Sequence, residues 1–283
     1  MSALLLAFGT VLAKALLSSG TLSLHPLTLL VAQLAGGLFV LLSFAGFTQQ
    51  ILWTGSLVRL ILPGLFIGVG SVGTILALYF TTASEASLIF ATQPIMVLFL
   101  ARMFLKEGIT MAVAILAMVA VAGVISIVQV GGSKEVFNRG YGISFAIFST
   151  TCAAIYVIWM RHSTKLSSPV MALITVQSVA FVVAFSVWAV WQFPGHADAR
   201  FYALGAAAVT GAIHYGAAFL LYLYGLRDLE ASKAGIYLSL VPVFTIVLAL
   251  IILDEVLTFQ QLVGGVVVIL AVGGVARLSA REQ

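Results

Sequence analysis

Long apolar runs, separated only by short stretches of Gly, Pro, Ser or charged residues, make up most of this chain. A helix that crosses the roughly 30 Å hydrocarbon core of a bilayer needs about 20 apolar residues, and the runs have about this length. Backbone groups in hydrocarbon must find hydrogen-bond partners inside the protein, and an α-helix supplies them within the segment. The sequence therefore predicts an all-α membrane protein surrounded by the lipid bilayer.

We count ten such runs and interpret each as one transmembrane helix. Hydrophobic residues make up 62% of the 283 residues and charged residues only 8%, against roughly half and a quarter in soluble domains. The first run lacks the charged start and the cleavage site of a signal peptide, so it counts as a span. The spans cover residues 3–19, 27–46, 57–79, 86–105, 110–130, 141–160, 169–193, 201–224, 233–253 and 259–277.

Positive charges in the connecting segments divide unevenly between the two sides of the membrane. Loops rich in Lys and Arg stay cytoplasmic, so we expect both termini to lie in the cytoplasm. The expected location is the bacterial inner (plasma) membrane. The net charge of +4 includes no block of basic residues, and no nucleic-acid partner is predicted. The cytoplasmic set is Arg59, Arg102, Lys106, Arg161, Lys165, Arg227, Lys233, Arg277 and Arg281, and the outer set is Lys134, Arg139 and Arg200.

An internal repeat relates the two halves of the chain. A shift of 148 residues, without a gap, brings Pro94 onto Pro242 and Glu107 onto Glu255. Two unrelated apolar helices would share Leu and Ala by chance, but would not repeat a proline and a Leu-x-Glu-x-x-Thr segment at one spacing. The same shift superposes Ala83, Ser84, Ala86, Leu105 and Thr110 on Ala231, Ser232, Ala234, Leu253 and Thr258. We interpret the halves as copies of one unit.

Each copy holds five predicted spans, and an odd number turns the second copy upside down relative to the first. Inverted repeats of this kind are common in secondary transporters. The predicted fold is thus ten transmembrane helices in two inverted five-helix repeats. The first repeat covers residues 1–130, a polar connecting loop covers 131–140, and the second repeat covers 141–283.

Segments 78–110 and 226–258 resemble the paired EamA repeats of the drug/metabolite transporter superfamily. They share a small-residue turn, a helix-borne proline and a Leu-x-Glu end, and the resemblance extends over nearly the whole chain. It implies export or exchange of small metabolites through a central cavity between the halves, without ATP hydrolysis. Phe8-Gly9-Thr10 stands where the family often has a Trp motif, Lys14 comes about two residues early, and Gln33 replaces a frequent Arg. These departures leave the subfamily and the substrate open.

Polar residues inside the predicted spans are the candidates for substrate contacts, because polar groups in hydrocarbon usually face a bundle interior or a wet cavity. His214 leads them, since a histidine can bind a carboxylate or carry a proton; the alternative is a bond to a neighbouring carbonyl. Lys14 could hold an anionic group or extend to the outer interface. The predicted binding set is His214, Gln93, Ser239, Thr151, Trp159, Tyr215, Tyr237 and Lys14.

Pro94 and Pro242 are predicted hinges, because each lies near the midplane of its span and lacks the N–H that would bond the carbonyl four residues earlier. Glu107 and Glu255 end their spans at the interface, and we interpret them as anchors or helix caps rather than as proton carriers. The single cysteine, Cys152, has no thiol partner for a disulfide or a metal site. We predict no metal, no cofactor and no catalytic residue.

A secondary transporter, an exporter or exchanger, is the function that these features favour. Trp159, Tyr156, Tyr215 and Tyr237, beside a few hydroxyl groups, favour a small amphipathic metabolite such as an amino acid. Transport of anionic phosphorylated or nucleotide-sugar metabolites, or a passive channel-like protein, are the alternatives. An enzyme is not expected, because no nucleophile, zinc or phosphate-loop motif is found. The coupling partner, a proton or a counter-solute, and the oligomeric state stay open.

Overall fold

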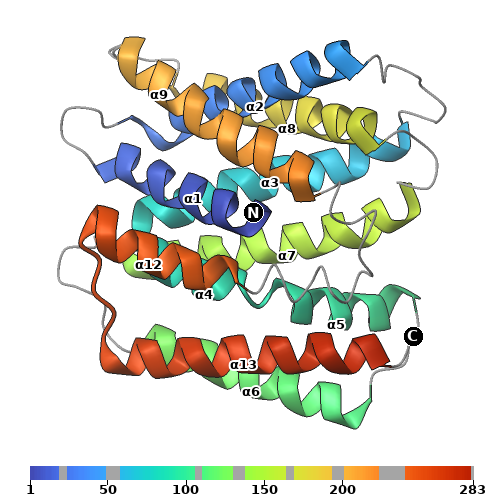
Figure 1. Cartoon of the computed structure of the whole chain (residues 1–283), viewed down its shortest axis with the longest axis vertical. Coiled ribbons are helices and arrows are strands. Elements are labelled where there is room, and N and C mark those ends of the chain that lie inside the picture. Colours follow the sequence, from blue (N-terminus) through green and yellow to red (C-terminus); the bar gives the residue numbers. More distant parts are fainter. Residues whose placement is uncertain are drawn as a thin grey trace.

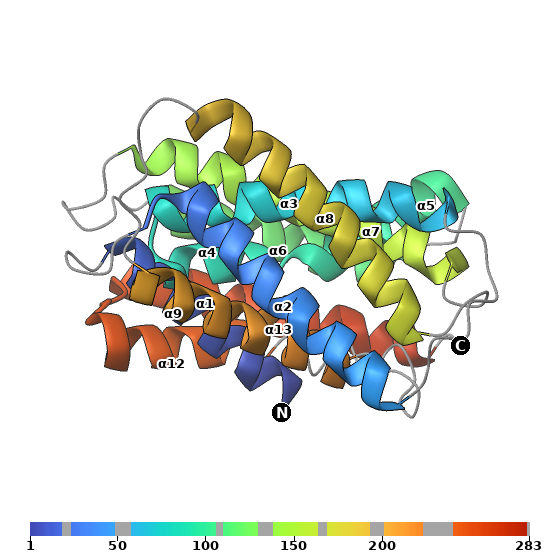
Figure 2. The same ribbon diagram turned by 90° about the horizontal axis from the view of Figure 1, so that it is seen from above.

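The computed structural model describes residues 1–18, 24–48, 58–105, 110–129, 138–163, 169–192, 201–222 and 240–281. Every secondary-structure element in these ranges is a helix. The first half contains α1 (Ser2–Ser18), α2 (Pro26–Thr48), α3 (Val58–Phe80), α4 (Ala83–Phe90), α5 (Gln93–Leu105) and α6 (Met111–Gln129). The second contains α7 (Arg139–Ser163), α8 (Pro169–Gln192), α9 (Phe201–Gly211), η1 (Ala212–Ala218), α12 (Val241–Leu253) and α13 (Phe259–Arg281). The helices pack in a bundle in which α2 and α8 run obliquely to α3 (Figures 1 and 2). The predicted all-α fold is confirmed.

Five stretches of these helices are long and apolar enough to cross a membrane by themselves. Each coincides with a predicted span, and shorter apolar helices occupy other predicted spans. The five are Pro26–Thr48, Arg59–Phe80, Arg139–Met160, Val170–Trp191 and Phe201–Tyr222; the shorter ones are Ser2–Ser18, Ala114–Gly123, Val241–Leu253 and Phe259–Val275.

Two pairs of equivalent helices, α5 with α12 and α6 with α13, begin at equivalent positions. Adding 148 to the bounds of α5, residues 93 and 105, gives 241 and 253, which are the bounds of α12. The same addition moves the start of α6, residue 111, onto the start of α13, residue 259. In this part of each half, the sequence repeat is therefore also a repeat of helix starts.

Contacts between helices follow the same two-fold relation. Helix α3 packs against α7 and α8, while its counterpart, formed by α9 and η1, packs against α1 and α2. Helices α6 and α13 are counterparts and pack against each other, side by side at the bottom of Figure 1. Each half thus buries its apolar surface mainly against the other half, which makes the interface between the halves the centre of the molecule.

The fourth predicted span, 86–105, is not one continuous helix. Helix α4 ends at Phe90, a turn follows at Ala91 and Thr92, and α5 begins at Gln93. Pro94 explains the break, because proline cannot donate to the carbonyl four residues earlier but is well tolerated in the first turn of a helix. Thr92 takes over at the junction, where its Oγ1 donates to Ile89 O at 2.7 Å and its own carbonyl accepts from Ile95 N at 3.0 Å. Pro94, a predicted hinge, thus lies directly after a break between two helices.

Pro242 occupies the corresponding place in the second half, within the first turn of α12. Its predicted span, 233–253, is described only from residue 240 onward, so Leu238 and the carbonyl expected to be freed there lie outside the described residues.

Helix α9 passes directly into a π-helical turn, η1, in the middle of the eighth predicted span. A π-helical turn bonds residue i to i+5 and contains one residue more than an α-turn, and such turns are frequent at functional sites. At its end the Phe219 N–H donates to Gly216 O. The carbonyl of Tyr215, which an α-helix would bond to Phe219, is thereby released to another partner.

Helices α2 and α9 approach so closely that only glycine fits at two positions. A Cβ on Gly211 would overlap the backbone carbonyl of Gln33, and a Cβ on Gly36 would overlap that of Ala208. Gln33 Nε2 also donates to Thr210 Oγ1 across this contact, at 3.0 Å. Small residues at helix interfaces are a common way for membrane helices to associate.

We expect Gly211→Ala to lower the free energy of unfolding by roughly 2 kcal/mol or more, because overpacking a tight contact forces the backbones apart. Thermal unfolding of the purified protein in detergent measures this. Gly205→Ala is the matched control on the same helix, since a Cβ there meets nothing within 4 Å. Equal stability of the two variants would show that the α2–α9 contact is looser than described.

Candidate functional site

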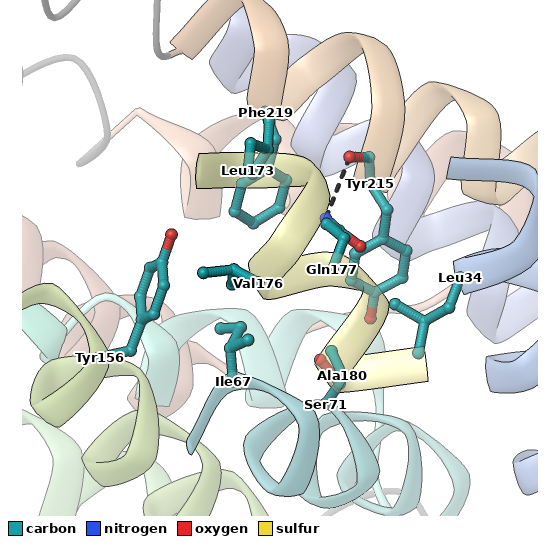
Figure 3. Close-up of a pocket in the computed structure, with 10 residues that line it drawn as sticks. All are labelled: Leu34, Ile67, Ser71, Tyr156, Leu173, Val176, Gln177, Ala180, Tyr215 and Phe219. Carbon is teal, nitrogen blue, oxygen red and sulfur yellow. Dashed lines mark hydrogen bonds between the residues drawn. The ribbon is translucent and has the colours of Figure 1, made fainter. Parts of the chain in front are cut away.

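A small pocket lies in the interior of the bundle between α2, α3, α7, α8 and η1. It encloses about 10 Å³, roughly the space of one water molecule. Its walls are mostly apolar, with a few polar side chains from different helices (Figure 3). The lining residues are Leu34, Ile67, Ser71, Tyr156, Leu173, Val176, Gln177, Ala180, Tyr215 and Phe219.

Two pairs of lining residues are counterparts in the two repeats. Ile67 corresponds to Tyr215 and Ser71 to Phe219, since 67 + 148 = 215 and 71 + 148 = 219. The pocket therefore lies where the two-fold relation brings equivalent parts of α3 and η1 together. None of the described residues that line it is charged.

Gln177 is the one amide side chain among the described lining residues, and only 5% of its surface is exposed. Its Nε2 donates to the released carbonyl of Tyr215 at 3.1 Å, as the dashed line in Figure 3 shows. Its Oε1 has no hydrogen-bond partner among the described residues. Ser71, on α3, contributes a hydroxyl group to the same lining.

A second polar cluster, the charged network, lies at one end of the bundle. Its centre is Glu85 in the first turn of α4, of which only 2% is exposed. Arg139 binds this carboxylate through two nitrogen atoms, with Nε at 3.1 Å from both oxygens and one terminal nitrogen at 2.9 Å from Oε1. Thr81 Oγ1 and Gln261 Nε2 also donate to it. The network therefore joins α4, α7 and α13.

Two further charges of the network bind the backbone at helix ends. Glu255 accepts hydrogen bonds from the N–H groups of Ala83 and Ser84 at 2.9 and 3.0 Å, so it caps α4 from the other repeat. Lys14 Nζ donates to the carbonyls of Leu78 and Thr81, each at 2.8 Å, just at the end of α3. A carboxylate at a helix start and an ammonium at a helix end both match the helix dipole. Glu255 therefore serves as a helix cap, as interpreted from the sequence.

The charged network is specific to one end of the bundle. The ends of α1, α3 and α12 meet there with the starts of α4, α7 and α13. Under the shift of 148, Glu85 corresponds to Lys233 and Gln261 to Val113, so the other repeat does not carry the same set of side chains. The two ends of the bundle are consequently held together by different interactions.

His214 lies in η1 but faces α1 rather than the pocket. Its Nδ1 lies 3.2 Å from Leu6 O, and a Cβ on Gly9 would come within 2.6 Å of the same nitrogen. The ring also contacts Tyr215 edge-on, at 4.8 Å between centroids. Of the predicted binding set, Tyr215 lines the pocket, whereas Lys14 belongs to the charged network.

Three other predicted residues gather where α5 meets α7. Thr151 donates to Ile147 O at 2.9 Å and lies 3.6 Å from Met96 Sδ. Trp159 stacks on Phe66, with ring centroids 6.0 Å apart, and contacts the tilted ring of Phe104 at 6.4 Å. Gln93 opens α5, directly after the helix break. Ser239 and Tyr237 lie outside the described residues.

The sequence analysis missed Gln177, Ser71, Glu85 and Arg139 as candidates. Gln177 carried a usable signal, because an amide in the middle of a long apolar run is costly unless it has partners. Glu85 stands one residue before the span predicted at 86–105, and Arg139 was assigned to the polar connecting loop. Their pairing depends on bringing α4 and α7 together, which no local pattern reveals.

The comparison with known families decides the identity of the fold. The model of the EamA-like transporter family matches residues 1–129 and again residues 140–277. The chain belongs to the EamA-like transporter family. The predicted fold of ten transmembrane helices in two inverted five-helix repeats is therefore confirmed. The transporter is not an enzyme, as the sequence predicted, and its partners are the bilayer and a transported substrate.

Individual relatives agree with this assignment. The transporter is 28% identical over 204 residues to an uncharacterized transporter of Archaeoglobus fulgidus, a match that covers 70% of this chain and 69% of that protein. It is also 28% identical over 221 residues to the uncharacterized transporter YyaM of Bacillus subtilis, covering 73% and 70%. A solved crystal structure shares the fold with a TM-score of 0.65, at 16% identity and 98% coverage of both chains.

We expect Glu85→Ala and Arg139→Ala each to lower the free energy of unfolding by roughly 3 kcal/mol, because either change leaves a buried charge without its partner. The double variant should lose clearly less than the sum of the two, since no unpaired charge then remains. Thermal unfolding in detergent measures all three, with Arg277→Ala, an exposed arginine of α13, as control. Strictly additive losses would show that the pair is not coupled.

Proposed function

We propose that this transporter is an exporter or exchanger of small amphipathic metabolites, amino acids among them, that works by alternating access. The observation that carries the proposal is the pocket, because repeat-equivalent residues of α3 and η1 line it together. A site on such an axis can be reached from either face by two nearly equivalent movements. At about 10 Å³ the pocket has room for about one water molecule and is too small for a metabolite, so substrate entry requires the halves to move apart.

The chemistry of the pocket favours a solute without a large net charge. Its polar groups are the Gln177 amide and hydroxyl groups, and its walls are aliphatic and aromatic. Phosphorylated metabolites and nucleotide sugars would need cations in the site, since burying an anionic phosphate without a partner is costly. Lys14, the cation suggested for that role, is already bound to two carbonyls at the end of α3.

The residues predicted from the sequence have two roles in this proposal, substrate binding and hinge bending. We propose His214, Gln93, Ser239, Thr151, Trp159, Tyr215, Tyr237 and Lys14 as a substrate-binding set that the solute meets when the two repeats, bounded at 1–130 and 141–283, move apart. Lys14 would first have to leave the carbonyls of Leu78 and Thr81. Pro94 and Pro242 are the proposed hinges, because the break between α4 and α5 allows the two parts of one span to tilt separately. The charged network would have to separate when its end of the bundle opens.

A counterflow experiment tests the proposal. Ligand stabilisation against a metabolite library first selects a solute, and vesicles loaded with that unlabelled solute are then given a trace of the labelled form. We expect a transient accumulation of label, because a carrier exchanges solute for solute. Simple equilibration without overshoot would indicate a channel and overturn the proposal.

Hinge function is read from the same assay. We expect Pro242→Ala and Pro94→Ala to slow exchange several-fold while changing equilibrium binding less, because an alanine N–H can bond the carbonyl four residues earlier and so favour one continuous helix in place of the proposed hinge. Pro26→Ala is the control, since Pro26 opens α2, where the missing N–H has no helical partner anyway. Wild-type exchange rates in both hinge variants would remove the prolines from the mechanism.

We propose further that both termini are cytoplasmic in a bacterial plasma membrane. The charged network then lies at the outer end, because α1 runs outward from the N-terminus to Lys14. Single cysteines at Ser133 and Ser279, in a Cys152→Ala background, should react with an impermeant thiol reagent from opposite sides. Permeabilised membranes provide the control in which both react. Reaction of both from one side would contradict this topology.

A further inference from the structure

We propose that the amide oxygen of Gln177 is the acceptor for an N–H or O–H group of the transported solute. This inference rests on the proposed function and adds the group by which the solute is recognised. The solute class that it specifies is small, neutral, zwitterionic or cationic, with a hydrogen-bond donor on an apolar body. A primary ammonium group is the simplest such donor.

The orientation of the Gln177 amide is fixed by its neighbour. Tyr215 O can only accept a hydrogen bond, so the group 3.1 Å from it must be the NH₂ end of the amide. Oε1 is therefore the end of the amide that does not face Tyr215 O, and it has no hydrogen-bond partner within the described part of the chain. Exchanging the two ends of the amide would set oxygen against oxygen.

The carbonyl that fixes the amide is supplied by the π-helical turn. Because Phe219 N–H bonds to Gly216 O, the Tyr215 carbonyl stays open to Gln177. In a regular α-helix the Phe219 N–H would occupy one acceptor position of this carbonyl and compete with the Gln177 amide. The backbone irregularity of η1 and the position of Gln177 on α8 are therefore two parts of one arrangement.

An amide oxygen buried without a partner is costly, and proteins seldom retain one without a reason. Gln177 Oε1 belongs to a side chain that is only 5% exposed, and it lies at a pocket whose other residues are uncharged. Figure 3 shows Gln177 among apolar side chains, with Tyr215 beside it and Tyr156 across the pocket. A donor-bearing solute would satisfy the oxygen, while Ile67, Val176 and Phe219 would contact its apolar body.

Leucine, its deaminated analogue isocaproate and its decarboxylated analogue isopentylamine form a matched set of probes. They share one apolar body and differ in the ammonium and carboxylate groups. Binding to the purified full chain in detergent is measured by thermal stabilisation over a range of concentrations. We expect leucine and isopentylamine to bind at least about tenfold more tightly than isocaproate, because isocaproate leaves the acceptor unpaired.

Gln177→Met keeps the length of the side chain but removes the acceptor, so the preference for isopentylamine over isocaproate should disappear. Gln177→Glu should increase that preference, since a carboxylate binds ammonium more strongly than an amide does. Gln33→Met is the matched control, because Gln33 is equally buried but pairs with Thr210 and does not line the pocket. It should leave the preference of the wild type unchanged.

Two results would overturn the assignment: the preference survives in Gln177→Met, or none of the three probes stabilises the wild type. Counterflow separates this failure from failure of the proposed function. Exchange that continues with the preference of the wild type in Gln177→Met removes Gln177 from recognition and leaves the carrier mechanism standing. If the preference depends on Gln177 but the wild type shows no counterflow, the binding site is supported and the exchange mechanism is rejected.

Discussion

The need to satisfy every backbone polar group inside hydrocarbon governs this structure. Regular helices meet that need by themselves, so partners from elsewhere are required only where a helix starts, stops or changes its winding. Glu255 supplies a partner at the start of α4, Lys14 at the end of α3, and Gln177 at η1. At these three points one helix is therefore tied to another by a polar side chain.

Two kinds of contact hold the repeats together, and they respond differently to movement. Along most of the interface apolar side chains and close helix approaches, such as Gly211 on Gln33, pack without strong directionality. At one end the charged network adds the Glu85–Arg139 ion pair and directional hydrogen bonds around Glu85. Separating charges in a dry environment costs far more than sliding apolar surfaces. Under the proposed alternating access, opening of that end would require a compensating interaction, so the two faces of the molecule would be unequal.

Much of the fold followed from local patterns in the chain. The length of each apolar run predicted the spans, and the 148-residue shift predicted equivalent helices, whose bounds in α5 and α12 then coincide. The site was less accessible. Tyr215 was identified from its place in an apolar run, but Gln177 was not, and its importance depends on a π-helical turn that composition does not reveal. His214 was placed mid-span from the sequence, and only the packing of α1 showed which neighbour it faces.

The sequence by itself determined that the chain is a helical membrane protein whose halves are copies of each other. Hydrophobicity and helix length depend on neighbouring residues, and the repeat is a fixed offset along the chain, so all three can be read without a structure. Tertiary structure alone decided which polar groups meet. Glu85 and Arg139 are 54 positions apart, and Glu85 and Gln261 are 176 apart. Whether a buried charge or amide finds a hydrogen-bond partner depends on the distance and the angle between the helices that pack together. Both are set by all the contacts of the interface together.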